Sequence, residues 1–488
     1  MKLIQPFLHL FPTQLQGRAP ASPLHKAENA IESLREKSIS CLQNMFSFVL
    51  PIERVMGLSL SERCRLYPDY ITFWAWAAQL LAGNKCCQWA VTLVQSWHQS
   101  NGTEPPGKGT KAYCNARMRI KDKFLDSLHG CILSFGRTRE RAGRLWNGFR
   151  LKAIDATSVK LMDTKANQEK HPQPSGQKPG CGFPVMGVVA VLDLATGMFV
   201  KALPVQKKRH DAKGLYKLLR YFRRGDVALA DRAYCSYVLI ALLLQRGAHC
   251  IMRLHQRRDA KKLWKQGKRL GKDSRLVSLG KPAKRSRCGV TKGQWRRLPG
   301  ELQLRLVRIR AKGRDGKKKT MYVVASLLDH KTYPCQDICE AYAQRWKIEV
   351  KFRDIKTTLG LEMFNVKTPA MAYKTLKVLV ISYNLVKALQ LEAIYNSDIR
   401  IDEISLKGTV DVIMEYRFEY RGLGNRPRLL KEAHLRLLDH VSDCLFIIRP
   451  GRSEPRAIKA RPKPHQYLTE DRSVFKEIIH RSKYRKAA

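Results

Sequence analysis

Hydrophobic spacing between Ala341 and Glu362, AYAQRWKIEVKFRDIKTTLGLE, predicts an amphipathic helix. One stripe along this helix is wholly apolar and consists of Ile348, Phe352, Ile355 and Leu359. At 100° per residue, a neighbouring stripe within roughly 60° carries Tyr342, Arg345, Glu349 and Lys356. The far side, expected to face solvent, carries Lys347, Lys351 and Asp354. We therefore expect the helix to pack by one stripe and to present polar side chains on the next.

Between residues 149 and 254 the pattern becomes strand-like. We expect a first strand that ends on Asp155, a polar loop, and a hairpin turning at 193–197. A helix (211–222), a buried strand (226–230) running into Asp231, a helix (237–246) and a strand (250–254) follow. This is the order of an α/β fold of the ribonuclease-H-like type. Its first and fourth strands are neighbours, so Asp155 and Asp231 are expected to meet at adjacent strand ends.

The flanking segments are expected to divide as follows. Residues 1–147 read as a helical DNA-binding domain, and residues 148–254 as the first part of the ribonuclease-H-like core. Residues 255–333 read as a β-rich insertion, because 118 residues separate Asp231 from Glu349, too many for a simple connection. The core ends in the signature helix (334–365), followed by a helical region (366–448) with amphipathic helices at 373–391 and 429–438, and a basic tail (449–488).

Charge narrows the choice of partner. The 91 Lys and Arg residues exceed the 41 Asp and Glu residues to leave a net charge of +50, spread along the whole chain. Such an excess favours a polyanion, and nucleic acid more than an anionic membrane surface. In the helix expected from residue 112, Arg117, Arg119, Lys121 and Lys123 either follow DNA phosphates or form an ordinary solvated face.

Other compositional features point to a location in the cytosol, and the family resemblance given below implies a bacterial cytosol and association with the nucleoid. No run of 18 apolar residues exists, and the N-terminus lacks the apolar region and cleavage site of a signal peptide. The 13 cysteines are scattered without zinc-site spacing, which favours reduced structural thiols.

A carboxylate among Tyr, Arg and Lys suits a site that handles a metal ion and phosphates together. Glu and Lys seven residues apart also occur on ordinary helices, but Y-x2-R-x3-E-x6-K should arise by chance on the order of once in 10^5 start positions. The chain matches every spacing of this signature at Tyr342, Arg345, Glu349 and Lys356. It resembles the DDE transposases of bacterial insertion sequences, in the branch with this signature, the insertion-sequence-four type.

The resemblance implies roles for particular residues. Asp155, Asp231 and Glu349 would be the catalytic acids and would bind two Mg²⁺ ions, with Mn²⁺ able to substitute. Tyr342, Arg345 and Lys356 would contact phosphates at the transposon end. The family also tends to have an Arg after the second Asp, and Arg232 matches; the following Ala233-Tyr234-Cys235 departs from the Asp-Arg-Glu-Ala-Asp form of some relatives.

Two tryptophans in the insertion allow a structural and a functional interpretation. Trp264 and Trp295 are flanked by Lys and Arg, so they could stack on an extruded base of DNA, or they could simply pack. The role of each aspartate, taken alone, also has two interpretations, since Asp155 could be a turn residue and Asp231 a helix cap. Their order before the signature glutamate favours the catalytic interpretation.

The function expected is that of a cut-and-paste DNA transposase that binds terminal inverted repeats of double-stranded DNA and acts as a homodimer on both ends and on target DNA. Metal-dependent strand cleavage follows from the three acids, whereas a hairpin intermediate is implied by the resemblance alone. Two alternatives stay open. One is a ribonuclease-H-like nuclease without strand transfer, and the other is a DNA-binding protein or inactive transposase relic.

Overall fold

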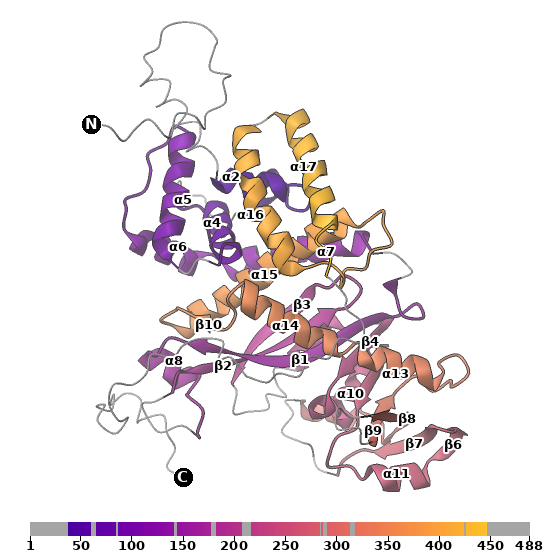
Figure 1. Ribbon diagram of the computed structural model, residues 1–488. Coiled ribbons are helices and arrows are strands. Elements are labelled where there is room, and N and C mark those ends of the chain that lie inside the picture. The colour runs from indigo at the N-terminus through magenta and orange to yellow at the C-terminus, as the bar shows by residue number, and fades with distance from the viewer. Residues whose placement is uncertain are drawn as a thin grey trace, which may run out of the picture.

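A computed structural model describes residues 38–59, 65–83, 86–140, 144–176, 182–206, 216–283, 285, 290–312, 318–423 and 426–446. Its centre is one mixed sheet with the strand order β3-β2-β1-β4-β5-β9-β8-β7-β6, and β10 pairs with β1 off this path (Figure 1). The strands are β1 (Arg150–Leu161), β2 (Val185–Asp193), β3 (Phe199–Gln206), β4 (Asp226–Ala230), β5 (His249–Arg253), β6 (Lys268–Gly271), β7 (Ser274–Gly280), β8 (Glu301–Lys312), β9 (Lys318–Ala325) and β10 (Met363–Phe364).

The first five strands have the pairing that the sequence predicts. Strands β1, β2 and β3 are antiparallel neighbours, and β4 and β5 continue from β1 in parallel. Buried, β-branched sequences occupy the middle of the sheet, as in β2, which is buried at every position. The insertion is not set apart from this sheet, because β9 pairs antiparallel with β5 and β8, β7 and β6 follow outward.

Helices from both ends of the chain lie together on one face of the sheet (Figure 1). Their apolar side chains belong to a single buried cluster, which includes Trp74, Phe124, Leu379 and Ile413. The helices that precede β1 are α2 (Ser38–Met45), α3 (Ile52–Gly57), α4 (Asp69–Leu81), α5 (Cys87–Ser100), α6 (Thr110–Arg119) and α7 (Asp122–Thr138). Those at the other end are α15 (Pro369–Ala393), α16 (Leu406–Leu423) and α17 (Pro427–Ser442).

The remaining helices lie close to the strands. They are α8 (Lys165–Lys170), α10 (Tyr237–Gln245), α11 (Ala260–Gln266), α12 (Lys292–Arg296), α13 (Cys335–Ala343) and α14 (Trp346–Thr358), with short 3-10 turns η3 (Leu219–Tyr221) and η4 (Arg232–Tyr234). Within the described residues, no helix has the length and apolarity needed to cross a membrane.

Alternation along β1 and β4 decides which face of the sheet each helix covers. Ala153 packs in the cluster that contains α14, and Val227 and Leu229 pack against α13. Ile154 and Ala228, one residue further on, pack instead with α10 on the opposite face. Odd-numbered side chains of both strands therefore face α13 and α14.

The signature segment is two helices rather than the single one expected. The amide of Arg345 donates to the carbonyl of Tyr342 (3.0 Å), and the amide of Lys347 donates to the carbonyl of Gln344 (3.0 Å). At the junction the hydrogen bonds therefore join residues three apart, as in a 3-10 helix, and not four apart. Tyr342 consequently lies in the last turn of α13, whereas Glu349 and Lys356 belong to α14.

Of the two sides expected for α14, only the apolar one is observed as predicted. Its apolar stripe is buried as predicted, and the ring of Phe352 stacks on Phe199 of β3 with centroids 5.4 Å apart. The side expected to face solvent does not, because α15 and α16 cover it. Lys351 is buried and lies 3.6 Å from Asp354, and Lys347 pairs with Asp402 at 3.1 Å.

Other expectations also need correction. The first strand does not end at Asp155 but continues along β2, and the loop after it contains α8. The helix expected at 373–391 is not amphipathic, since α15 is buried nearly all round between the helices of both chain ends. Of the helix expected at 211–222, residues 211–215 lie outside the described residues, as does the tail from 449.

The basic helix expected from residue 112 is divided into α6 and α7. Its Arg117 is only partly exposed. The guanidinium stacks on the rings of Trp76 (5.1 Å) and Tyr113 (4.9 Å) and so contributes to packing. The sequence analysis did not predict the bounds of α16, although Leu406, Val410 and Ile413 form a buried stripe at helical spacing.

Candidate active site

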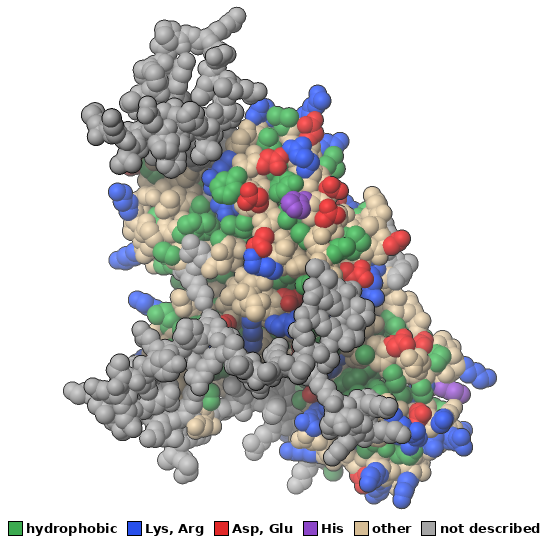
Figure 2. All heavy atoms as spheres, in the orientation of Figure 1, with side chains coloured by type: hydrophobic (Ala, Val, Ile, Leu, Met, Phe, Trp, Pro, Cys, Tyr) green, Lys and Arg blue, Asp and Glu red, His purple; other side chains and the backbone are tan. Residues whose placement is uncertain are grey.

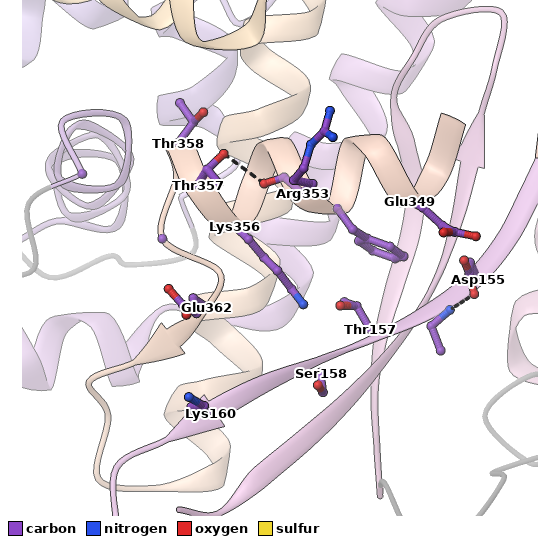
Figure 3. A pocket seen from close by; sticks show the side chains of 14 residues that line it. Asp155, Thr157, Ser158, Lys160, Glu349, Arg353, Lys356, Thr357, Thr358 and Glu362 are labelled. Carbon is purple, nitrogen blue, oxygen red and sulfur yellow. Dashed lines mark hydrogen bonds between the residues drawn. The ribbon is translucent and has the colours of Figure 1, made fainter. Parts of the chain in front are cut away.

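The three expected acids come from β1, the end of β4, and α14. In the parallel pairing of β1 with β4, Ile154 lies opposite Ala230. Asp155 and Asp231 are the next residues along these two neighbouring strands. Both have odd numbers and point to the face that α13 and α14 cover. Glu349 reaches down from α14, and Figure 3 shows its carboxylate close to that of Asp155. The predicted convergence of Asp155 with Glu349 is thus observed across nearly 200 residues of chain.

Arg345 lies between two of these acids. Its Nη1 is 2.8 Å from Oε1 of Glu349 and 3.6 Å from Oδ2 of Asp155, and its side chain is only 13% exposed. Burial raises the pKa of Asp155, and the neighbouring Glu349 and Asp231 raise it further, whereas the Ala156 amide and Arg345 oppose them. The guanidinium therefore supplies the positive charge that makes this density of carboxylates tolerable.

The other two signature residues lie on either side of Arg345. Tyr342 is buried on α13, with its ring 6.0 Å from the Arg345 guanidinium, and burial raises its pKa. Lys356 lies two turns beyond Glu349 on α14, and its side chain extends from the helix toward β1 (Figure 3). Burial lowers the pKa of Lys356, and Glu362 opposes that change.

A cleft of about 1040 Å³ lies between β1 and α14 and contains Asp155, Glu349 and Lys356 in its lining. The sequence analysis did not select several further polar residues of this cleft, which are Thr157, Ser158, Lys160, Arg353, Thr357, Thr358 and Glu362. A signal existed for two of them. Thr157 is two residues after Asp155 on a strand, and Arg353 is four after Glu349 on a helix, so each shares a face with an acid.

The acids fit a divalent metal ion by their chemistry, since carboxylate oxygens are hard ligands and their mutual repulsion calls for a cation. In the described part of the chain, however, no three His, Cys, Asp or Glu side chains form a group that could hold a metal ion as they stand. Arg345 is placed between two of the acids instead. Metal binding by all three acids would therefore require these side chains to rearrange.

Of the remaining predicted DNA-binding residues, Arg232 lies next to an acid, and the two tryptophans are engaged in packing. Arg232 is exposed on η4, directly after Asp231. Trp264 lies between the guanidinium groups of Arg275 (4.6 Å) and Arg308 (4.5 Å). The backbone of Trp295 accepts a hydrogen bond from Lys281 (2.7 Å), whose ammonium also lies 5.3 Å from the ring. These contacts match the packing interpretation of both tryptophans, and base stacking stays a prediction.

The surface around the sheet differs in charge from that of the helical layer. Figure 2 shows Lys and Arg side chains gathered at the end of the molecule where β6, β7 and α11 lie, whereas Asp and Glu are frequent over α16 and α17. The exposed cations of the basic end include Lys261, Lys262, Lys265, Lys268, Arg269 and Lys272. On the face that Figure 2 shows, positive charge therefore gathers at the insertion.

The chain is similar in sequence to known transposases. The family model described as the transposase DDE domain matches residues 146–385. Transposase InsG for insertion sequence element IS4, from Escherichia coli (strain K12), is 24% identical over 325 residues, which cover 65% of this chain and 69% of that protein. A cryo-EM structure of the piggyBac transposase synaptic complex with hairpin DNA matches with a TM-score of 0.37 and 10% identity, over 86% of this chain and 87% of that one. A likeness of that size says nothing further about this chain.

Proposed function

Since the chain belongs to the DDE transposases of the insertion-sequence-four type, we propose that it is a cut-and-paste transposase. It would bind the terminal inverted repeats of its element and cleave and join DNA strands at the cleft between β1 and α14. The single observation that carries this proposal is the meeting of Asp155 with Glu349 across the guanidinium of Arg345, beside Asp231.

In this proposal Asp155, Asp231 and Glu349 hold two Mg²⁺ ions, or Mn²⁺ in their place. When bound, such ions activate the attacking oxygen and stabilise the leaving oxygen of a phosphoryl transfer. Arg345 supports the assignment because it neutralises the acids in the absence of metal, and a guanidinium binds phosphate oxygens well once released from a carboxylate. Lys356, on the wall of the same cleft, would bind a phosphate of the transposon end.

Binding of the DNA would extend beyond the cleft. The basic surface of the insertion (255–333) supports a path for DNA next to the acids. The ribonuclease-H-like core would be formed by residues 148–254 and 334–365, with the described helices that precede β1 and those from α15 onward on one face. Synapsis of both ends by a homodimer, and opening of the donor through a hairpin, complete the proposal and follow from the family.

The test uses end-labelled DNA that carries the candidate terminal repeat, incubated with the protein in Mg²⁺ or Ca²⁺ and separated on a denaturing gel. We expect a Mg²⁺-dependent nick at the boundary of the repeat, followed by a product of hairpin size. A nick without strand joining would favour the ribonuclease-H-like nuclease. Specific binding with no cut in either metal would instead identify a DNA-binding relic.

A further inference from the structure

Strand β1 has one edge that is paired only in part. On the side away from β2, it pairs with β4 over residues 150–154 and with β10 over residues 160–161. Between these two strands, residues 155–159 have no strand partner on that edge within the described chain. The gap opens into the cleft, because Asp155, Thr157, Ser158 and Lys160 all line it.

The direction of each backbone amide in this gap follows from the β1–β2 pairing, in which consecutive residues point alternately toward and away from the partner strand. The amide of Leu161 donates to Pro184 on the β2 side (2.9 Å), and that of Arg150 donates to Gly225 on the β4 side (2.9 Å). The register of β1 with β2 is unbroken from residue 152 to residue 160. Even-numbered residues of β1 therefore direct their amides toward the gap.

Three amides point this way near the acids, and two are already engaged. The amide of Ala156 donates to the carboxylate of Asp155 (2.8 Å), and that of Lys160 donates to the carbonyl of Glu362 (3.0 Å). The amide of Ser158, between them, has no acceptor among the residues that the structure describes. The strand thus offers a single free donor to whatever enters the cleft.

The surroundings of this donor favour an anion. Figure 3 shows Lys356 extending from α14 toward Thr157 and Ser158, so an ammonium group and two hydroxyl groups lie around the gap. Lys160 adds a second positive charge on the same wall. Amide, hydroxyl and ammonium donors together are the groups that proteins use to hold phosphate oxygens.

We propose that the Ser158 amide, assisted by the ammonium of Lys356, binds a phosphate next to the scissile one on the same DNA strand. Ser158 is three residues beyond Asp155, which is about 10 Å along an extended strand. It therefore holds a neighbouring phosphate and positions the strand rather than contacting the reacting atoms. This inference rests on the proposed function, because it requires the scissile phosphate to lie at the acids.

The first experiment scans the DNA. Methylphosphonate linkages, which lack the charged oxygen, replace one phosphate at a time around the cleavage position. Binding is measured with the Glu349→Gln protein so that no DNA is cut. We expect one position beside the scissile phosphate to weaken binding about tenfold, as expected for a hydrogen bond to a charged group.

The second experiment removes the donor. Replacing Ser158 by its α-hydroxy acid turns the amide into an ester and deletes the N–H, which has no role in the sheet. This protein should bind unmodified DNA about tenfold more weakly, and the sensitive methylphosphonate should cost it less than it costs the wild-type protein. Ser158→Ala, which keeps the amide, should lose less. The matched control is the ester at Val159, whose amide points toward β2; it should lower the melting temperature without coupling to any phosphate.

The proposal would be overturned if the losses in binding free energy caused by the Ser158 ester and by every methylphosphonate were fully additive. In that case, normal cleavage by the wild-type protein would leave the transposase assignment standing. Absence of specific end binding by the wild-type protein would instead remove the proposed function, and the phosphate subsite with it. Coupling at the scissile phosphate itself would also contradict the proposal, since it would place Ser158 at the reacting atoms.

Discussion

A buried ion pair anchors the strand that carries Asp231, and its removal should loosen the active site. Lys152 of β1 is 3% exposed and Asp226 of β4 is 1% exposed. The ammonium donates to Asp226 Oδ2 (2.6 Å) and to the carbonyl of Tyr221 (2.7 Å), and the same carboxylate oxygen accepts from the amide of Arg223 (2.8 Å). Burial lowers the pKa of Lys152, and Asp226 opposes that change, so the carboxylate is what keeps the lysine charged.

Asp226→Asn should therefore leave a poorly compensated charge inside the sheet. Removal of one partner of a buried pair costs about 3–5 kcal/mol, and we expect the lower end because the Tyr221 carbonyl stays in place. Replacing both partners, Lys152→Met with Asp226→Leu, should restore the free energy of unfolding to within about 1 kcal/mol. Only the double variant deletes both charges together, so it serves as the matched control.

Urea unfolding followed by circular dichroism gives the free energies, and hydrogen exchange of peptides from β1 and β4 locates the loss. Peptides from α17 should exchange as in the wild type. Because β4 leads into Asp231, the Asp226→Asn protein should lose nicking activity more than end binding. A cost below about 1 kcal/mol for Asp226→Asn, or equal destabilisation by the double variant, would refute the reasoning.

Three further predictions concern the cleft and the insertion. Glu349→Gln should abolish nicking in Mg²⁺ while end binding changes little, and cutting at the wild-type rate would remove Glu349 from the catalytic set. The pKa of Lys356 is lowered from 10.5, so its positive charge is present at low pH and is lost as pH rises through that lowered value. End affinity should fall in that range and the Lys356→Arg protein should show a flatter profile, whereas identical profiles in a gel-shift titration would exclude the role. Trp264→Ala should lower stability by about 2 kcal/mol through lost packing, and an unchanged melting temperature with weaker DNA binding would instead support base stacking.

Local patterns in the sequence were sufficient to predict the order of the core strands and the elements that carry the three acids. Buried β-branched runs identify β2 and β4, and the acids stand next to strands or on a helix whose apolar stripe is buried as expected. These features depend on residues close together in the chain, where side-chain periodicity directly reflects the backbone. The proximity of Asp155 to Asp231 was also predicted from the parallel pairing of their strands, although β1 continues past Asp155 to Leu161.

Contacts between distant segments decided the rest. Lys351 and Asp354 look solvated on a single helix, but α15 and α16 bury them, and α15 itself is enclosed by helices from both ends of the chain. The division between α13 and α14 arises from hydrogen bonds over three residues that no side-chain pattern reveals. The free amide of Ser158 is the clearest case, because β4 ends and β10 begins on either side of it. A backbone donor is the same in every residue except proline, so only strand pairing in the folded protein determines whether it is free.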